Sequence, residues 1–85
     1  MLEGLTYDDD DFPPVGVVAP GTSWNDVVDH IKIAHDFLVI PPDDDGNWAG
    51  AYWTGTEMTV MQDLGTDQDE AVENLREELR CRGEL

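Results

Sequence analysis

The sequence predicts a two-layer α+β domain, in which two helices pack on a three-stranded antiparallel sheet in the order helix, strand, strand, strand, helix. Three observations lead to this prediction. Apolar residues recur at helical spacing after position 23 and again after position 67. Between these stretches lie a continuous apolar run, an aromatic run and a short alternating run, which are typical of strands. The length of 85 residues suits one small domain with a thin core.

The first predicted helix begins after Ser23 and ends near His35. Serine is a favoured N-cap because its hydroxyl oxygen accepts a hydrogen bond from the first helical turn. Six residues form the apolar stripe of this helix: Trp24, Val27, Val28, Ile31, Ala34 and Leu38. One strand over residues 31–40 is the alternative, because Ile31 and Ile33 alternate with polar neighbours, but the longer helical pattern favours the helix.

Three strands are expected to follow. The first is Phe37–Ile40, and the Pro-Pro pair after it ends the strand because proline lacks the backbone N–H that a sheet needs. The Asp-rich segment that closes with Gly46 is a turn, since Asp-Gly is a strong hairpin signal. Residues 47–54 return as the second strand, in which Gly50 indicates a bulge or a close backbone approach. Residues 57–62 form the third strand.

The last predicted helix begins after Asp67, with Glu70 three residues further on completing a capping box. Four apolar residues form its buried stripe: Ala71, Val72, Leu75 and Leu79. Three arginines lie towards its C-terminal end: Arg76, Arg80 and Arg82. Positive charge is favourable there because the helix dipole is negative at that end.

With both helices on one face, the other face of the predicted sheet is left uncovered. Side chains alternate along a strand, so Trp48 and Tyr52 point to one face and Trp53 to the other. One of these sets belongs to the core. The other set makes the uncovered face a candidate binding surface.

Residues 1–21 are expected to form an acidic, Pro-rich arm outside the domain, which comprises residues 22–85. Four consecutive aspartates repel one another, and three prolines favour extended backbone. A flexible tail is therefore the favoured interpretation. The alternative is a short edge strand around Val15, with Tyr7 and Phe12 anchoring the arm to the domain.

The net charge of −16 comes from twenty acidic and four basic residues. Direct binding to DNA or RNA phosphates is excluded, because the charges have the same sign. Two explanations of the charge remain open. It attracts a basic partner protein, or it solvates the chain in a salty cytoplasm, since aspartate outnumbers glutamate and lysine is almost absent.

The sequence shows no motif for metal binding or catalysis. The Asp-rich turn does not match an EF-hand loop, because placing Gly46 at the central glycine puts Pro41 first and Tyr52 twelfth. His30 and His35 are five residues apart, a spacing that does not stack two ligands on one helical face. No nucleophile–base pattern or phosphate-binding loop occurs. We expect no enzyme activity, no metal and no cofactor.

We expect a soluble, cytoplasmic protein. No apolar run reaches the ~18–20 residues of a membrane span, and the N-terminus lacks the basic-then-apolar order of a signal peptide. The single cysteine, Cys81, excludes an internal disulfide and suits a reducing compartment.

Residues 37–79 resemble the partner-binding domain of HicB-type antitoxins. The hairpin half of the resemblance is FLVIPPDDDGNWAGAYW, and the helix half is GTDQDEAVENLREEL, with Thr66 and Asp67 in swapped order. The link MTVMQDLG is longer than in that family, and the element before the third strand is missing. The resemblance implies a non-catalytic protein that occludes a small, basic, RNA-cleaving toxin.

The first functional hypothesis is a non-catalytic acidic protein that inhibits a basic nucleic-acid-binding protein, with a HicB-like antitoxin as its named version. The alternative is a phage-encoded DNA mimic that blocks CRISPR, restriction or repair proteins. Both use carboxylates to imitate a backbone with one charge per ~1.7 Å of duplex axis. The third hypothesis is a salt-adapted small domain without an inhibitory role. A homodimer is compatible with each of them.

The expected partner-binding residues are two acidic clusters and the aromatic residues of the second strand. Each cluster concentrates charge beside aromatic side chains, which are enriched among residues that dominate binding energy. These residues are Asp8, Asp9, Asp10, Asp11, Asp43, Asp44, Asp45, Trp48, Tyr52 and Trp53.

Overall fold

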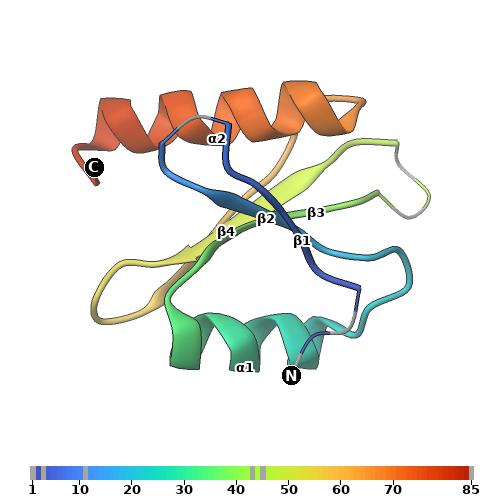
Figure 1. Cartoon of the computed structure of the whole chain (residues 1–85), viewed down its shortest axis with the longest axis horizontal. Coiled ribbons are helices and arrows are strands. Elements are labelled where there is room, and N and C mark those ends of the chain that lie inside the picture. The colour runs from blue at the N-terminus through green and yellow to red at the C-terminus, as the bar shows by residue number, and fades with distance from the viewer. Residues whose placement is uncertain (1, 3, 11, 43, 45, 85) are drawn as a thin grey trace.

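A computed structural model of the chain describes residues 2, 4–10, 12–42, 44 and 46–84. Within these residues, five strands form one sheet, with one helix above it and one below it (Figure 1). The elements follow in the order β1 (Thr6–Asp8), β2 (Val15–Val17), α1 (Trp24–Ala34), β3 (Phe37–Ile40), β4 (Ala49–Trp53), β5 (Met58–Met61) and α2 (Gln68–Arg82).

The order of strands in the sheet is the order in the sequence, from β1 at one edge to β5 at the other. β2 pairs with β3 in parallel, with Gly16 opposite Leu38, whereas the other three neighbouring pairs are antiparallel. Parallel neighbours need a crossover connection. Here α1 is that connection, and it lies against one face of the sheet (Figure 1).

The predicted three-stranded antiparallel sheet with two helices on one face was wrong. The sheet is mixed and five-stranded, because residues 1–21, expected as an arm, supply β1 and β2. The crossover helix α1 occupies one face, so α2 packs on the opposite face (Figure 1). Both faces of the sheet are therefore covered, and the expected uncovered binding face does not exist.

Two apolar clusters fill the space between the sheet and its helices. The cluster on the α2 side contains Val15, Val17, Val39, Tyr52, Met61, Leu64, Ala71, Val72, Leu75 and Leu79. The cluster on the α1 side contains Leu2, Val18, Val27, Ile31, Leu38 and Ala51. Trp48 packs against the first cluster and Trp53 against the second, which confirms the predicted alternation along β4.

Gly50 allows α2 and its preceding segment to approach β4 closely. A Cβ at this position would lie 2.7 Å from Leu64 Cδ1 and 3.2 Å from Leu75 Cδ1. The close approach at Gly50 is made by two leucine side chains, which occupy the space that a Cβ would take. A side chain here would push α2 away from the sheet.

The two helices differ at their N-termini. Asp67 caps α2, since its Oδ1 accepts a hydrogen bond of 2.8 Å from the backbone N–H of Glu70. Ser23 occupies the N-cap of α1 with an extended backbone, but its side chain makes no capping hydrogen bond. The predicted helix starts are confirmed, whereas the predicted role of the Ser23 side chain was wrong.

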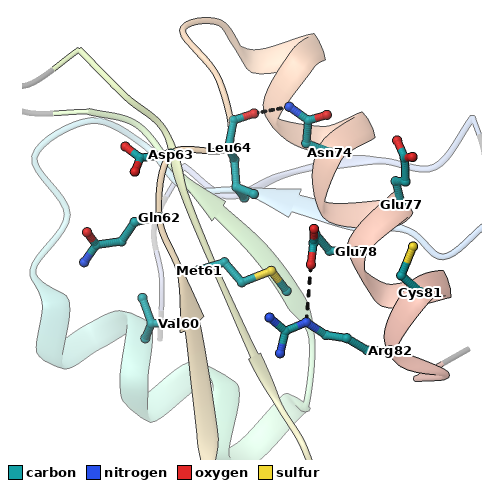
Figure 2. Close-up of a pocket in the computed structure, with 10 residues that line it drawn as sticks. All are labelled: Val60, Met61, Gln62, Asp63, Leu64, Asn74, Glu77, Glu78, Cys81 and Arg82. Atoms are coloured by element: carbon teal, nitrogen blue, oxygen red, sulfur yellow. Dashed lines mark hydrogen bonds and ion pairs between the residues drawn. The ribbon is translucent and has the colours of Figure 1, made fainter.

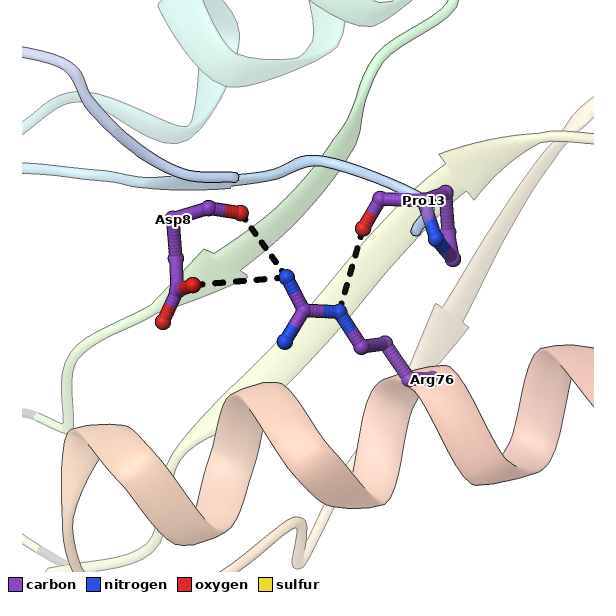
Figure 3. A network of polar contacts seen from close by, with 3 residues as sticks. All are labelled: Asp8, Pro13 and Arg76. Carbon is purple, nitrogen blue, oxygen red and sulfur yellow. Dashed lines mark hydrogen bonds and ion pairs between the residues drawn. The ribbon is translucent and has the colours of Figure 1, made fainter. Parts of the chain in front are cut away.

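Arg76 is buried in the middle of α2, with 5% of its surface exposed, and does not serve the helix end as predicted. Its Nε donates to the Pro13 carbonyl oxygen at 3.1 Å. Its Nη2 donates to the Asp8 carbonyl oxygen at 2.8 Å and lies 3.4 Å from the Asp8 carboxylate (Figure 3). The guanidinium thereby holds the β1–β2 segment against α2.

The two N-caps give a first prediction. Asp67→Ala removes a real capping bond and should lower the free energy of unfolding by ~0.5–2 kcal/mol. Ser23→Ala should cost less than about 0.5 kcal/mol, because no side-chain bond is lost. Urea denaturation followed by circular dichroism measures both, with Leu75→Ala at about 2–5 kcal/mol as the core reference. Equal losses for the two cap variants would contradict this assignment.

Arg76 gives a second prediction. Arg76→Met leaves two carbonyl oxygens and a partly buried carboxylate without their donor, so it should cost about 1.5–3 kcal/mol of unfolding free energy. The matched control is Arg80→Met, which removes the same charge from an exposed position on α2 and should cost less than about 0.5 kcal/mol. Urea denaturation compares the two. Similar losses would show that net charge matters and the contact does not.

Candidate binding surface at the β5 edge

β5 is one of the two edge strands of the described sheet, since it pairs with β4 alone, and β1 is the other. Thr54 N–H donates to the Glu57 carbonyl oxygen at 2.9 Å at the end of the β4–β5 hairpin. Bonding alternates along antiparallel strands, so Met58 and Val60 direct their backbone groups away from β4. Such groups are ready to pair with another extended chain.

A bulge follows β5 at Gln62 and Asp63. Met61 lies opposite Gly50, so an unbroken ladder would place Asp63 opposite Trp48. Instead Trp48 N–H donates to Gly65 at 2.8 Å and its carbonyl accepts from Leu64 at 2.9 Å. Asp63 has a φ of 58°, in the left-handed region that aspartate tolerates better than most residues. Both bulged side chains are exposed at the edge of the sheet.

One groove of about 390 Å³ lies between β5 and α2 (Figure 2). Met61 forms its apolar floor, and Figure 2 shows this side chain directed toward α2. Three carboxylates line the groove, from Asp63, Glu77 and Glu78, against the single guanidinium of Arg82. The groove is therefore acidic.

The four charged groups of this groove are not equally engaged. Arg82 Nε lies 3.4 Å from Glu78 Oε2 (Figure 2). The pKa of Arg82 is raised above its ordinary value, first by the Tyr52 hydroxyl and then by its hydrogen bond to Glu78. Among the described residues, the side chains of Asp63 and Glu77 make neither an ion pair nor a hydrogen bond. Two carboxylates are therefore available to a cation from outside.

A second groove, of about 490 Å³, lies on the α1 side of the same edge. Trp24, at the start of α1, is 44% exposed, and Val60 of β5 is 40% exposed. Ile40 adds apolar surface to the groove, and Asp44 and Asp63 add carboxylates. This groove therefore combines exposed apolar side chains with the carboxylates of Asp44 and Asp63.

The two grooves meet at the edge of the sheet. Both are lined by Val60, Gln62 and Asp63. They lie on opposite faces, because one is walled by α2 and the other by α1 and the β3–β4 hairpin. We call this continuous region, with its two grooves and the strand between them, the β5-edge surface.

The aromatic residues predicted for binding have different places in the structure. Trp48 is half-buried and packs its side chain against the α2-side cluster, and it also borders the α1-side groove. Tyr52 is only 1% exposed and belongs to the core on the α2 side. Trp53 is half-buried and stacks on His35, with 5.7 Å between the ring centroids. Of the three, only Trp48 contributes to the β5-edge surface.

The predicted acidic clusters are not brought together. Asp44 lines the α1-side groove, whereas Asp8, Asp9 and Asp10 lie in or after β1 at the opposite edge of the sheet. Asp8 is occupied by Arg76, and the other two are exposed. The remaining predicted residues, Asp11, Asp43 and Asp45, lie outside the described residues.

Sequence reasoning missed most of the β5-edge surface. It placed Trp24 in a buried stripe and gave Asp63, Glu77 and Glu78 no role. The carboxylates gave no signal, since acidic residues are common throughout this chain.

A separate cluster of titratable groups joins β1 to the end of α1. The Tyr7 hydroxyl donates to Asp36 Oδ2, and His30 Nε2 lies 2.8 Å from the same oxygen. The hydrogen bond to Asp36, with burial and the nearby negative charge, raises the pKa of Tyr7 to about 12. The cluster fastens the β1 edge, and the described residues contain no group of three metal-ligating side chains.

No family model matches the chain, and neither a curated protein nor a solved structure matches it. The resemblance to HicB-type antitoxins therefore stays a prediction.

The described part of the chain contains no helix with the length and apolar character needed to cross a membrane.

Tyr7 gives a third prediction. Its folded pKa of about 12 exceeds the ordinary value of 10.0, so the neutral hydroxyl stabilises the fold below pH 10. This contribution should be lost as the pH rises from 10 towards 12. Thermal denaturation should therefore show a difference between the protein and Tyr7→Phe below pH 10 that shrinks above it. A constant difference across this range would contradict the assigned pKa.

Proposed function

We propose that this chain is a non-catalytic acidic protein that binds and inhibits a basic nucleic-acid-binding protein. The observation that carries the proposal is the β5-edge surface, where exposed apolar side chains lie among carboxylates. Trp24 and Val60 supply apolar contact area, and Asp63 and Glu77 supply negative charge without an internal cation. Interfaces combine such a desolvated centre with surrounding charges that speed and select association.

Two of the four basic residues pair with carboxylates of the chain itself, so the surface as a whole remains strongly negative. Arg76 is buried against Asp8. Of the four basic residues, Lys32, Arg80 and Arg82 are exposed, against twenty acids, and Arg82 is paired with Glu78. A surface of this kind attracts the cationic face with which another protein holds nucleic acid.

The proposal defines the partner by its class, a basic nucleic-acid-binding protein. The resemblance to HicB-type antitoxins favours a small, basic, RNA-cleaving toxin. A CRISPR, restriction or repair protein is the partner if the chain is a phage-encoded DNA mimic. Cytoplasmic location suits both, and the exposed free thiol of Cys81 suits a reducing compartment.

Exposed apolar side chains favour binding over the salt-adaptation hypothesis. Solvation in concentrated salt is served by carboxylates and does not need Trp24 or Val60 at the surface. Trp24 and Val60 lie at one edge of the sheet, beside two grooves, which supports an interface there.

Two matched charge variants test the proposal. The partner is captured from the native host, and its nuclease or nucleic-acid-binding activity is titrated with this chain. Asp44→Asn with Asp63→Asn removes two charges from the β5-edge surface and should slow association about 2–10-fold at low salt. Asp9→Asn with Asp10→Asn removes two charges at the β1 edge and should leave association unchanged.

Three outcomes decide between the hypotheses. Stoichiometric inhibition that weakens with rising salt, and that the first variant impairs, supports the inhibitor. Capture of a partner whose activity is unaffected by the chain contradicts it. Equal loss of folding stability in concentrated salt for both variants, with no inhibition by either, would favour the salt-adapted domain.

A further inference from the structure

We propose that β5 takes up an extended segment of the partner as a sixth strand, and that this segment alternates basic with apolar side chains. The inference rests on the proposed function and names the kind of segment that the β5-edge surface accepts. It follows from three features: the open backbone of β5, the alternation of its side chains, and the different chemistry of the two grooves.

The backbone of β5 is suited to pairing over a short length. Met58 and Val60 present their N–H and C=O groups away from β4. The bulge at Gln62 and Asp63 ends this open stretch, because it turns the backbone out of the ladder. An added strand therefore pairs along the four residues Met58–Met61. In such complexes main-chain hydrogen bonds supply affinity and side-chain pockets supply specificity.

The side chains of an added strand alternate between the two grooves. Met58 packs on the α1-side cluster and Met61 belongs to the α2-side cluster. Because side chains alternate along a strand, Met58 and Val60 point to the α1 side, and Thr59 and Met61 to the α2 side. Residues opposite Met58 and Val60 therefore face the α1-side groove. Residues opposite Thr59 and Met61 face the α2-side groove.

The α2-side groove selects basic side chains. Asp63 and Glu77 have no cation among the described residues, and Glu78 shares only Arg82. The stem of a lysine or arginine lies along Met61 while its charged end reaches these carboxylates. An acidic or neutral residue gains no such partner.

The exposed apolar side chains of the α1-side groove favour apolar residues of the added strand. Trp24, Ile40 and Val60 line it, and the tryptophan is 44% exposed before any partner binds. Burying this surface is favourable because apolar area leaves water. The two grooves together therefore favour a segment with the pattern basic, apolar, basic, apolar.

A second copy of this chain fits the edge less well. Pairing β5 with β5 of another molecule would bring two chains of charge −16 together, with Asp63, Glu77 and Glu78 repeated on both sides. The segment MTVM of β5 contains no basic residue to fill the α2-side groove. Charge complementarity favours the basic partner segment.

The test uses a short capped peptide of alternating lysine and valine. Its controls are a peptide of the same composition with lysines and valines in separate blocks, and an alternating peptide N-methylated at every second residue. Binding is followed at low salt by tryptophan fluorescence and by the rate of alkylation of Cys81, which lines the α2-side groove. We expect the alternating peptide to bind and to slow alkylation.

The controls separate strand pairing from general charge attraction. N-methylation removes main-chain donors and should weaken binding by about tenfold, the loss of one or two such hydrogen bonds. Val60→Pro removes an outward N–H from β5 and should do the same, whereas Val60→Ala keeps this donor and should cost less. Circular dichroism establishes that the proline variant is folded, and the N-methylated peptide gives the same test without any variant.

A second pair of variants tests the acidic groove. Glu77→Gln with Asp63→Asn should weaken the alternating peptide about 3–10-fold and reduce its dependence on salt. Asp9→Asn with Asp10→Asn, at the opposite edge, should leave binding unchanged. Equal effects of the two pairs would overturn the assignment of the groove.

Two further results would overturn the inference. One is equal binding of the block, N-methylated and alternating peptides. The other is dimerisation of the chain in analytical ultracentrifugation that Val60→Pro abolishes, since the edge would then belong to a second copy. Either result leaves the inhibition assay of the proposed function unaffected. Loss of inhibition in that assay, with peptide pairing intact, would instead contradict the proposed function alone.

Discussion

The parallel pairing of β2 with β3 decides the architecture of this protein. Parallel neighbours cannot be joined by a tight turn, so the chain between them must cross one face of the sheet, and α1 does so. That face is then occupied, and the apolar stripe of α2 is buried on the other. A small chain thereby acquires two thin cores in place of one, with Val15 and Leu38 both fully buried.

Covering both faces leaves the edges of the sheet as its open surfaces, and the two edges differ. At the β1 edge, Arg76 holds Asp8 and Pro13 against α2, and Tyr7 is bonded to Asp36. At the β5 edge, the bulge at Asp63 shortens the open stretch and separates two grooves of different character. Side-chain contacts tie β1 to α2 and to the residues after α1, whereas β5 is bordered by the two grooves. The proposed binding mode uses this difference.

Local sequence was enough to predict the helices and strands whose own residues show a clear periodicity or a capping residue. The periodicity of α2 and the capping residue Asp67 correctly located that helix, because helical hydrogen bonds and caps join residues four or fewer positions apart. α1 and strands β3 to β5 were likewise found close to their actual bounds. Alternation along β4 correctly separated Trp48 and Tyr52 from Trp53. It did not indicate that Tyr52 is buried.

The tertiary structure alone decided what depends on distant partners. β1 and β2 have three residues each, which is too short to show a periodicity. They are strands because β1 pairs with β2 and β2 pairs with β3, which follows it in the chain only after α1. Arg76 has an ordinary sequence position on a helix, and its role comes from carbonyls more than sixty residues away. The β5-edge surface joins Trp24, Val60 and Glu77 from three elements. The sequence by itself determined the local elements and the charge, whereas their pairing and the resulting site required contacts that no local pattern encodes.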